Sequence, residues 1–118
     1  MKIQKKNISI SGIKFSVKND DKEIAWAFLY IIKNSRHKEP YGFFENLYVE
    51  EEYRKQGIGK KIINVLIEEA KKNNCYKILA TSRHSKPKVH TLYEKFGFKN
   101  HGLEFRMDLM NSPTLQKD

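Results

Sequence analysis

The alternation of apolar and polar residues in the first half of the chain predicts an antiparallel meander of β-strands. Residues 8–17 alternate in two registers that exchange at Gly12, so this stretch is either one strand with a bulge there or two strands joined by a tight bend. The sequence Asn-Asp-Asp-Lys at residues 19–22 has the composition of a hairpin turn. Residues 23–33 are apolar on both faces, which indicates a central strand, and residues 41–49 predict the next strand.

A helical period replaces the alternation in the second half of the chain. Residues 59–73 are predicted to form a helix because their apolar positions share one face, with Val65 as the outlier. These positions are Ile62, Ile63, Leu66, Ile67 and Ala70. Residues 76–81 predict a short strand, which we expect to run parallel to strand 41–49 because a helix separates the two.

A second helix is predicted after a polar loop, with Pro87 in its first turn and Ser85 as its cap. Gly97 is expected to end this helix. Its inner face is formed by Val89, Leu92, Tyr93 and Phe96. The alternation of residues 103–109 predicts a closing hairpin, and residues 111–118 are expected to fray.

This order of elements indicates an α/β fold with a mixed sheet in one domain over residues 1–110, followed by a tail at 111–118. Apolar residues at 39% and charged residues at 31% are typical of a soluble globular protein. The apolar runs are too short for a membrane span, and we expect no signal peptide. A single cysteine, Cys75, agrees with a reducing compartment, so the cytoplasm is the expected location.

The net charge of +9 raises nucleic acid as a partner. The lysine pairs lie on different predicted elements, however, which favours a solvated basic surface and makes nucleic acid an unlikely partner. The histidines lack the spacing and the neighbouring carboxylate or cysteine ligands of a metal site, so no metal is expected.

The turn between strand 41–49 and the first helix has the chemistry of an anion site. A helix N-terminus carries backbone N–H groups without intrahelical partners and a partial positive charge. Gly57 and Gly59 permit close approach of a ligand to the backbone there. Formal positive charge surrounds these donors on Arg54, Lys55, Lys60 and Lys61. The turn therefore suits a phosphate or pyrophosphate.

Two common phosphate loops do not fit this turn. A Walker loop needs a glycine five residues before Gly59 and Ser or Thr at position 61, where the chain has lysine. The dinucleotide motif G-x-G-x-x-G needs a glycine at position 62, where the chain has isoleucine.

The stretch Arg54-Lys55-Gln56-Gly57-Ile58-Gly59 instead matches the signature [Q/R]-x-x-G-x-[G/A], with Glu45-Asn46-Leu47-Tyr48-Val49 before it. Thirty residues later follows Leu92-Tyr93-Glu94-Lys95-Phe96-Gly97-Phe98. Together these blocks resemble the GCN5-related N-acetyltransferase (GNAT) superfamily over residues 43–109. The resemblance implies a mixed, mostly antiparallel sheet flanked by helices. It also implies acetyl-CoA as co-substrate and an amine, on a small molecule or a protein, as acceptor.

The resemblance also assigns site residues. It gives the backbone of Leu47, Tyr48 and Val49 to the pantetheine and acetyl groups, between two strands that splay apart. It gives the CoA phosphates to Arg54, Lys55, Gln56, Gly57, Ile58, Gly59 and Lys60. Lys86 stands where family members often have asparagine on the pantetheine arm, and it is long enough to reach a CoA phosphate.

Two side chains are the catalytic candidates. By resemblance, Tyr93 is the general acid for the leaving thiolate, against the alternative of a core aromatic residue on a helix face. Glu45 is the candidate base, against the alternative of an ordinary solvated carboxylate. The chain lacks the two helices that the family usually carries between its first two strands, so a non-catalytic acyl-CoA-binding domain is the alternative function. The open sheet also makes a homodimer possible.

Overall fold

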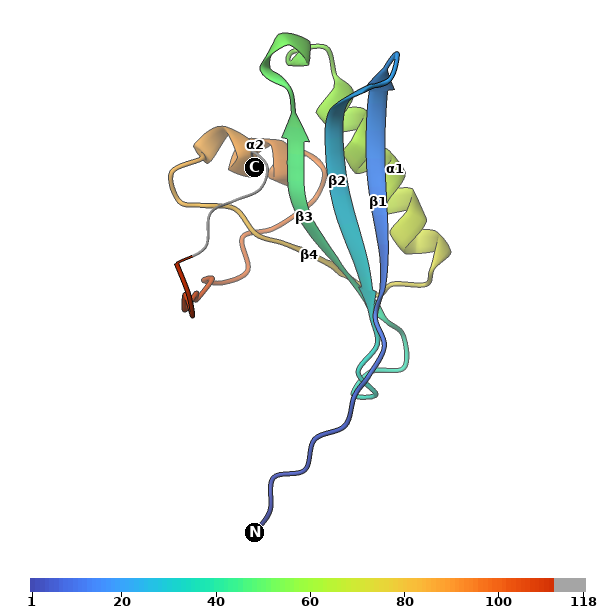
Figure 1. Cartoon of the computed structure of the whole chain (residues 1–118), viewed down its shortest axis with the longest axis vertical. Coiled ribbons are helices and arrows are strands. Elements are labelled where there is room, and N and C mark those ends of the chain that lie inside the picture. Colours follow the sequence, from blue (N-terminus) through green and yellow to red (C-terminus); the bar gives the residue numbers. More distant parts are fainter. Residues whose placement is uncertain (112–118) are drawn as a thin grey trace. The chain divides into compact units, whose positions relative to one another are not determined.

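The computed structural model of the protein describes residues 1–111. Their contacts form two compact units, residues 1–80 and a second unit from Thr81 onward, and each is considered by itself. The first unit contains, in chain order, β1 (Ser11–Asn19), β2 (Lys22–Ile32), β3 (Tyr41–Val49), the 3-10 helix η1 (Glu51–Tyr53), α1 (Ile58–Lys72) and β4 (Ile78–Ala80). The second contains α2 (Pro87–Lys95) (Figure 1). One domain over residues 1–110 stays a prediction.

The four strands form one mixed sheet in the order β1-β2-β3-β4. The pairs β1–β2 and β2–β3 are antiparallel, and β4 is parallel to β3, as predicted. The strand predicted as central, β2, lies between β1 and β3, which explains why it is apolar on both faces. β3 pairs with β4 over only three residues, so it extends well beyond this shorter strand.

The predicted bulge or bend at Gly12 is wrong. Gly12 lies inside β1 and pairs regularly with Tyr30, and the register of the β1–β2 ladder shifts instead between Val17 and Lys18. The alternation before Gly12 belongs to residues 1–10, which have exposed side chains and run away from the sheet (Figure 1). An alternating pattern indicates a strand only where a neighbouring strand supplies hydrogen bonds, and this segment has none in the structure.

The β1–β2 hairpin turns at Asp20 and Asp21, as predicted, with Asp20 in the left-handed region at a φ of 56°. Polar side chains join the two strands beyond the turn. Lys14 Nζ lies 2.9 Å from Glu23 Oε2, and the Ser16 hydroxyl donates to the same oxygen at 2.8 Å. The hydrogen bond from Lys14, followed by that from Ser16, lowers the pKa of Glu23.

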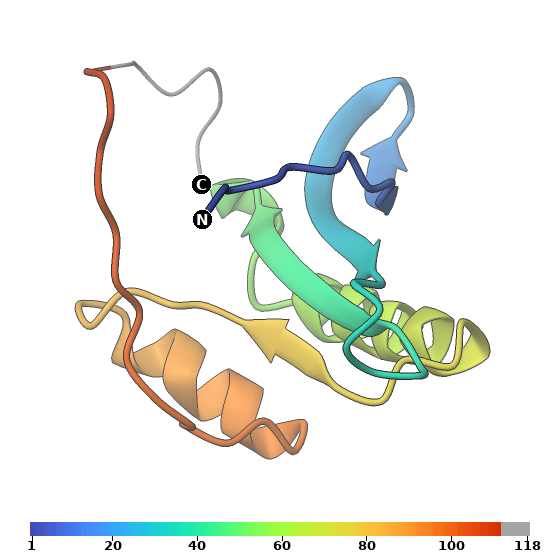
Figure 2. The same ribbon diagram turned by 90° about the horizontal axis from the view of Figure 1, so that it is seen from below.

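The core lies between the sheet and α1, which contacts β2 and β3 (Figure 2). One face of β2 presents small side chains at Ala25 and Ala27, so a helix can approach the strand closely. The fully buried large side chains are Leu29, Phe44, Ile63 and Leu66. The opposite face of β2 carries the rings of Trp26, Phe28 and Tyr30.

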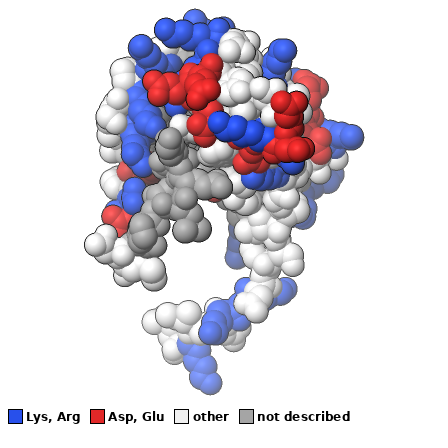
Figure 3. Space-filling model, turned by 45° about the horizontal axis from the view of Figure 1, so that its top comes forward, with Lys and Arg blue, Asp and Glu red and all other residues white. Residues whose placement is uncertain are grey.

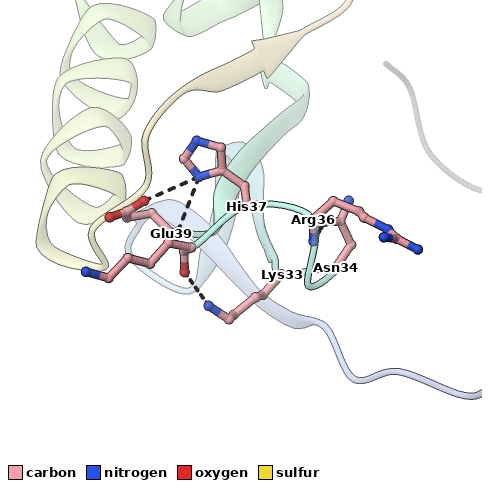
Figure 4. Close-up of polar contacts among 6 residues, drawn as sticks. Lys33, Asn34, Arg36, His37 and Glu39 are labelled. Carbon is pink, nitrogen blue, oxygen red and sulfur yellow. Dashed lines mark hydrogen bonds and ion pairs between the residues drawn. The ribbon is translucent and has the colours of Figure 1, made fainter.

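The loop between β2 and β3 is held by its own polar groups (Figure 4). The Lys33 ammonium donates to the Lys38 carbonyl, and the Arg36 backbone N–H donates to Asn34 Oδ1 at 3.0 Å. His37 Nδ1 lies 3.3 Å from the Glu39 carboxylate. These contacts close the connection that sets the two strands in register.

In the second unit, the predicted cap of α2 is wrong and its predicted end is confirmed. Lys86, rather than Ser85, occupies the N-cap position, and no side chain makes a capping hydrogen bond. At the other end Gly97 has a φ of 97°, and its N–H donates to the Glu94 carbonyl at 3.0 Å. The Phe98 N–H donates to the Tyr93 carbonyl at 3.1 Å, which completes a Schellman motif.

The predicted closing hairpin is also wrong. Residues 98–111 contain no strand, and the alternating apolar side chains of this segment are largely exposed. They are Leu103, Phe105, Met107 and Leu109. The strand predicted over residues 76–81 is shortened to three residues for a related reason, because only Ile78–Ala80 finds a partner on β3. The predicted tail begins at Asn111, and its remaining residues lie outside those described.

We expect the substitution Leu66→Ala to lower the free energy of unfolding by roughly 2 to 5 kcal/mol, because it leaves a cavity where a fully buried side chain packs. The control is its neighbour Val65→Ala, which removes an apolar side chain that is 55% exposed. That change should stay within about 0.5 kcal/mol. Urea unfolding of both variants measures the difference, and equal effects would contradict this packing of α1.

Candidate active site

A bulge in β3 sets the geometry of the predicted pantetheine strand. The β2–β3 register passes from the pair Phe28 and Glu45 to the pair Trp26 and Tyr48, so two residues of β3 face the single residue Ala27. The bulged residue is Asn46, whose φ of 57° lies in the left-handed region that asparagine tolerates better than most residues.

The bulge exchanges the sides to which β3 directs its backbone groups. Before it, the Gly42 N–H donates toward the β4 side, to the Lys77 carbonyl at 2.9 Å. After it, the Glu50 N–H donates toward β2, to the Ile24 carbonyl at 2.8 Å. Because successive residues of a strand alternate sides, Leu47 and Val49 direct their backbone away from β2.

Among residues 1–111, no strand pairs with this side of β3 beyond the bulge. The ladder with β4 ends at the pair Phe44 and Ala80. Leu47 and Val49 therefore present backbone groups on this open edge of β3, and their pairing with the pantetheine arm stays a prediction. Tyr48, which was predicted with them, instead directs its backbone toward β2. It contributes to this region through its side chain.

The Tyr48 ring belongs to a stack that holds the following turn. The Tyr48 ring stacks on Trp26 with 5.0 Å between ring centroids, and the Arg54 guanidinium lies 5.2 Å from the centroid of the Tyr48 ring. Arg54 Nε also donates to the Val49 carbonyl at 2.8 Å. Arg54, which was predicted to add charge at the phosphate turn, is thus anchored to the end of β3. Because Arg54 occupies the Val49 carbonyl, the N–H is the open backbone group of Val49.

The glycine turn has the backbone of an anion site. Lys55 and Gly57 have φ values of 64° and 81°, which turn the chain into α1. The first helical hydrogen bond runs from the Lys61 N–H to the Gly57 carbonyl at 3.1 Å, so the N–H groups just before Lys61 lie at the free N-terminus of α1. Gln56 and Lys60 have exposed side chains beside these donors.

Gly59 brings the anion site and the open strand edge together. A Cβ at this position would lie 3.8 Å from Val49 Cγ2 and 4.0 Å from Leu47 Cδ2. The N-terminus of α1 therefore touches the same two residues whose backbone is open. Ile58, the first residue of α1, has a half-buried side chain and contributes its backbone to this end of the helix.

Glu45 stands immediately before the bulge, on the face of the sheet opposite α1. Its side chain is half-buried, and its carboxylate accepts a hydrogen bond from the Tyr30 hydroxyl. Burial raises the pKa of Tyr30, and this hydrogen bond and the charge of Glu45 raise it further, so the phenol stays protonated.

Tyr93 and Lys86 belong to the second unit. Tyr93 lies two residues before the end of α2, with its ring centroid 5.5 Å from that of Phe98 across the Schellman motif. Burial raises the pKa of Tyr93, which keeps the hydroxyl protonated at neutral pH, as a general acid requires. Lys86 is exposed at the N-cap of α2, and its N–H donates to the Arg83 carbonyl at 3.1 Å.

Within residues 1–111, no three His, Cys, Asp or Glu side chains gather as a metal site would need. None of the helices in this part of the chain combines the length and the apolar character needed to cross a membrane. Acidic and basic side chains are interspersed on the face shown in Figure 3, which does not present one continuous basic surface.

The chain belongs to the acetyltransferase (GNAT) family, whose sequence model matches residues 6–98. The co-substrate of this family is acetyl-CoA. The glycine turn, the bulged strand and the Tyr93 helix all lie within the matched range, and the mixed sheet is the expected one.

Named relatives agree with the family. Glucosamine 6-phosphate N-acetyltransferase of Trypanosoma brucei brucei is 38% identical over 78 residues, which are 65% of this chain and 50% of that protein. A putative acetyltransferase from Agrobacterium tumefaciens is 33% identical, with a TM-score of 0.75 over 82% of this chain and 68% of its own. An acetyltransferase of Trypanosoma brucei is 31% identical, with a TM-score of 0.71 over 85% and 69%. The chain spans half the length of the curated relative.

Sequence reasoning missed three features of this region: the bulge at Asn46, the bond from Arg54 to Val49, and the hydrogen bond between Tyr30 and Glu45. Asn46 carried the only local signal, because asparagine is uncommon within an apolar strand and tolerates a left-handed conformation. The other two contacts depend on the register of β2 against β3, which the bulge itself sets.

The two glycines of the turn should respond differently to alanine. Gly57→Ala should lower the free energy of unfolding by about 1 to 2 kcal/mol and weaken acetyl-CoA binding, because a left-handed φ is strained with a Cβ. Gly59→Ala should raise stability by up to about 1 kcal/mol and keep binding, since its Cβ meets only ordinary contacts within a helix. Chemical unfolding and calorimetry test both, and a reversed order would contradict this geometry.

We expect Arg54→Lys to weaken acetyl-CoA binding although the charge is kept, because lysine lacks both the Nε donor and the planar group that stacks on Tyr48. The lost hydrogen bond should also cost about 1 kcal/mol of stability. Arg36→Lys, in the exposed β2–β3 loop, is the matched control. Binding by Arg54→Lys equal to that of the parent protein would mean that only the charge matters.

Proposed function

We propose that the protein transfers the acetyl group of acetyl-CoA to an amine. The observation that carries the proposal is the contact position of Gly59, which joins an anion-binding helix N-terminus to the open backbone of Leu47 and Val49. Acetyl-CoA has the complementary order of groups, a pyrophosphate followed by an arm with amides and a thioester. Family membership and the named N-acetyltransferase relative support the same reaction.

In this proposal the residues of the turn bind the CoA phosphates, and the open edge of β3 orients the amide-bearing arm. Residues 54–60 hold the phosphates through backbone N–H groups and lysine charge. The backbone of Leu47 and the N–H of Val49 pair with the amide-bearing arm as an added strand. In this proposal a backbone N–H at the bulge donates to the thioester oxygen as negative charge develops on it.

Proton transfer falls to two side chains. Glu45 accepts a proton from the acceptor ammonium, which frees the nitrogen lone pair for attack on the acetyl carbon. The carbon–sulfur bond then breaks, and Tyr93 donates its proton to the leaving thiolate. The nitrogen gives up its second proton to the Tyr93 phenolate or to water, which leaves a neutral amide. The raised pKa of Tyr93 agrees with this role.

The alternative, a domain that binds acyl-CoA without turnover, is favoured by one observation. β1 and β2 are joined directly at Asp20 and Asp21, so the helices that the family usually carries there are absent from this position.

We also propose a cytoplasmic location, supported by the single cysteine, and a homodimer, supported by the exposed apolar residues of the 103–109 segment. The acceptor named for the trypanosomal relative, glucosamine 6-phosphate, is the first to assay.

Calorimetric titration with acetyl-CoA, using ATP as the anion control, tests cofactor binding. We expect saturable binding of acetyl-CoA and weaker binding of ATP, because the open strand edge contributes only to a ligand with an amide-bearing arm. Equal binding of both ligands would reduce the turn to a basic loop and remove the enzyme proposal with it.

The change Tyr93→Phe separates the enzyme from the binding domain. Turnover should fall by about tenfold to a hundredfold or more, within the range typical of general acid catalysis, while acetyl-CoA binding stays. The control is Tyr76→Phe, because Tyr76 stacks on His37 and is not one of the predicted site residues. Unchanged turnover in Tyr93→Phe would remove its acid role.

A further inference from the structure

The face of the sheet opposite α1 carries an acid among aromatic rings. Glu45 pairs directly with Phe28 across β2 and β3, and Phe28 pairs with Lys14 across β1 and β2. Tyr30 follows on the same face of β2, with its ring nearly parallel to that of Phe28 at 6.4 Å between centroids. All of these residues belong to the first unit.

The negative charge of Glu45 has no cationic partner on this face. Its carboxylate accepts from the neutral Tyr30 hydroxyl, and it forms no ion pair among residues 1–111. The lysine of the same cross-strand row, Lys14, is already paired with Glu23 at 2.9 Å. A half-buried carboxylate in this setting favours the approach of a cation.

The rings beside Glu45 favour the same kind of ligand. Aromatic faces attract ammonium groups, and the Lys14 ammonium already lies 5.9 Å from the centroid of the Phe28 ring. The Tyr30 ring is given room by Gly12, its partner on β1, where a Cβ would come within 3.1 Å of the ring. Its hydroxyl interacts with the Glu45 carboxylate, which raises the pKa of Tyr30.

We propose that Phe28, Tyr30 and Glu45 bind the protonated nitrogen of the acceptor, and that the acceptor is a primary amine with no carboxylate beside its nitrogen. This inference rests on the proposed acetyl transfer and names its substrate class. An α-amino acid would bring its own carboxylate next to Glu45, where two negative charges repel in a partly desolvated setting. Tyr30 acts as a positioning residue, and Phe28 supplies the surface on which the ammonium rests.

The position of Glu45 joins this surface to the chemical step. It stands two residues before Leu47, whose open backbone is proposed to hold the arm that ends in the thioester. After Glu45 takes one proton from the bound ammonium, the nitrogen forms a bond to the acetyl carbon and the carbon–sulfur bond breaks. The leaving thiolate takes the proton of Tyr93, and the nitrogen loses its second proton to the Tyr93 phenolate or to water, so the products are a neutral amide and CoA.

Matched acceptors test the substrate class. We expect kcat/KM for 2-phenylethylamine and tyramine to exceed that for phenylalanine and tyrosine by about tenfold or more, since each pair differs only in the carboxylate. Equal values, or a preference for the amino acids, would overturn the proposal.

Variants of the face test the residues. Tyr30→Phe and Phe28→Leu should each raise KM for tyramine by about tenfold while acetyl-CoA binding stays, because they remove the group that orients Glu45 or the ring beside it. Tyr30→Phe should also shift the pH profile of kcat/KM, which a merely structural change would not do. Tyr76→Phe is the matched control, and thermal unfolding verifies that each variant is folded.

The outcomes separate this inference from the function on which it rests. Transfer by the parent protein with unchanged KM in Tyr30→Phe and Phe28→Leu would overturn the inference alone. Absence of both acetyl-CoA binding and transfer would overturn the proposed function. In that case calorimetry of tyramine with the parent protein and with Glu45→Gln still decides, because equal or absent binding would show that this face does not select a cation.

Discussion

The backbone hydrogen bonding of β3 is the constraint on which the candidate site depends. A strand in the middle of a sheet uses its N–H and C=O groups on both sides, so it has none to offer a ligand. Here the short strand β4 leaves one side of β3 unpaired after Phe44, and the bulge at Asn46 decides which residues face that side. Leu47 and Val49 are open for that reason, and the contact of Gly59 with both fixes the position of α1 beside them.

The stack of Trp26, Tyr48 and Arg54 transmits this arrangement to the phosphate turn. Trp26 is almost fully buried, so the Tyr48 ring rests on a rigid base, and Arg54 is held by that ring and by the Val49 carbonyl. The turn therefore begins from a fixed point although its own side chains are exposed. Preorganisation of this kind reduces the entropy that a ligand must remove when it orders a loop.

Much of the architecture was predictable from the sequence because local patterns determine it. Three features all follow from residues close in the chain: the strand β2 that is apolar on both faces, the helical face of Leu66 and its neighbours, and the start of α2 at Pro87 with its stop at Gly97. The failures share one cause. Residues 8–10 and 103–109 have the pattern of strands, but a strand also needs a partner, and partners are set by contacts distant in sequence.

The site divides in the same way. Its phosphate turn was predictable because the glycines and cations are contiguous, whereas the bulge and the environment of Glu45 depend on how β2 and β3 pair.

The sheet order has a consequence for how this region forms. Because β1, β2 and β3 are consecutive in the chain and in space, their pairing closes only short loops, and such pairing is favoured early in folding. The parallel addition of β4 must span all of α1, so the open edge of β3 is expected to exist before the core beside it is complete.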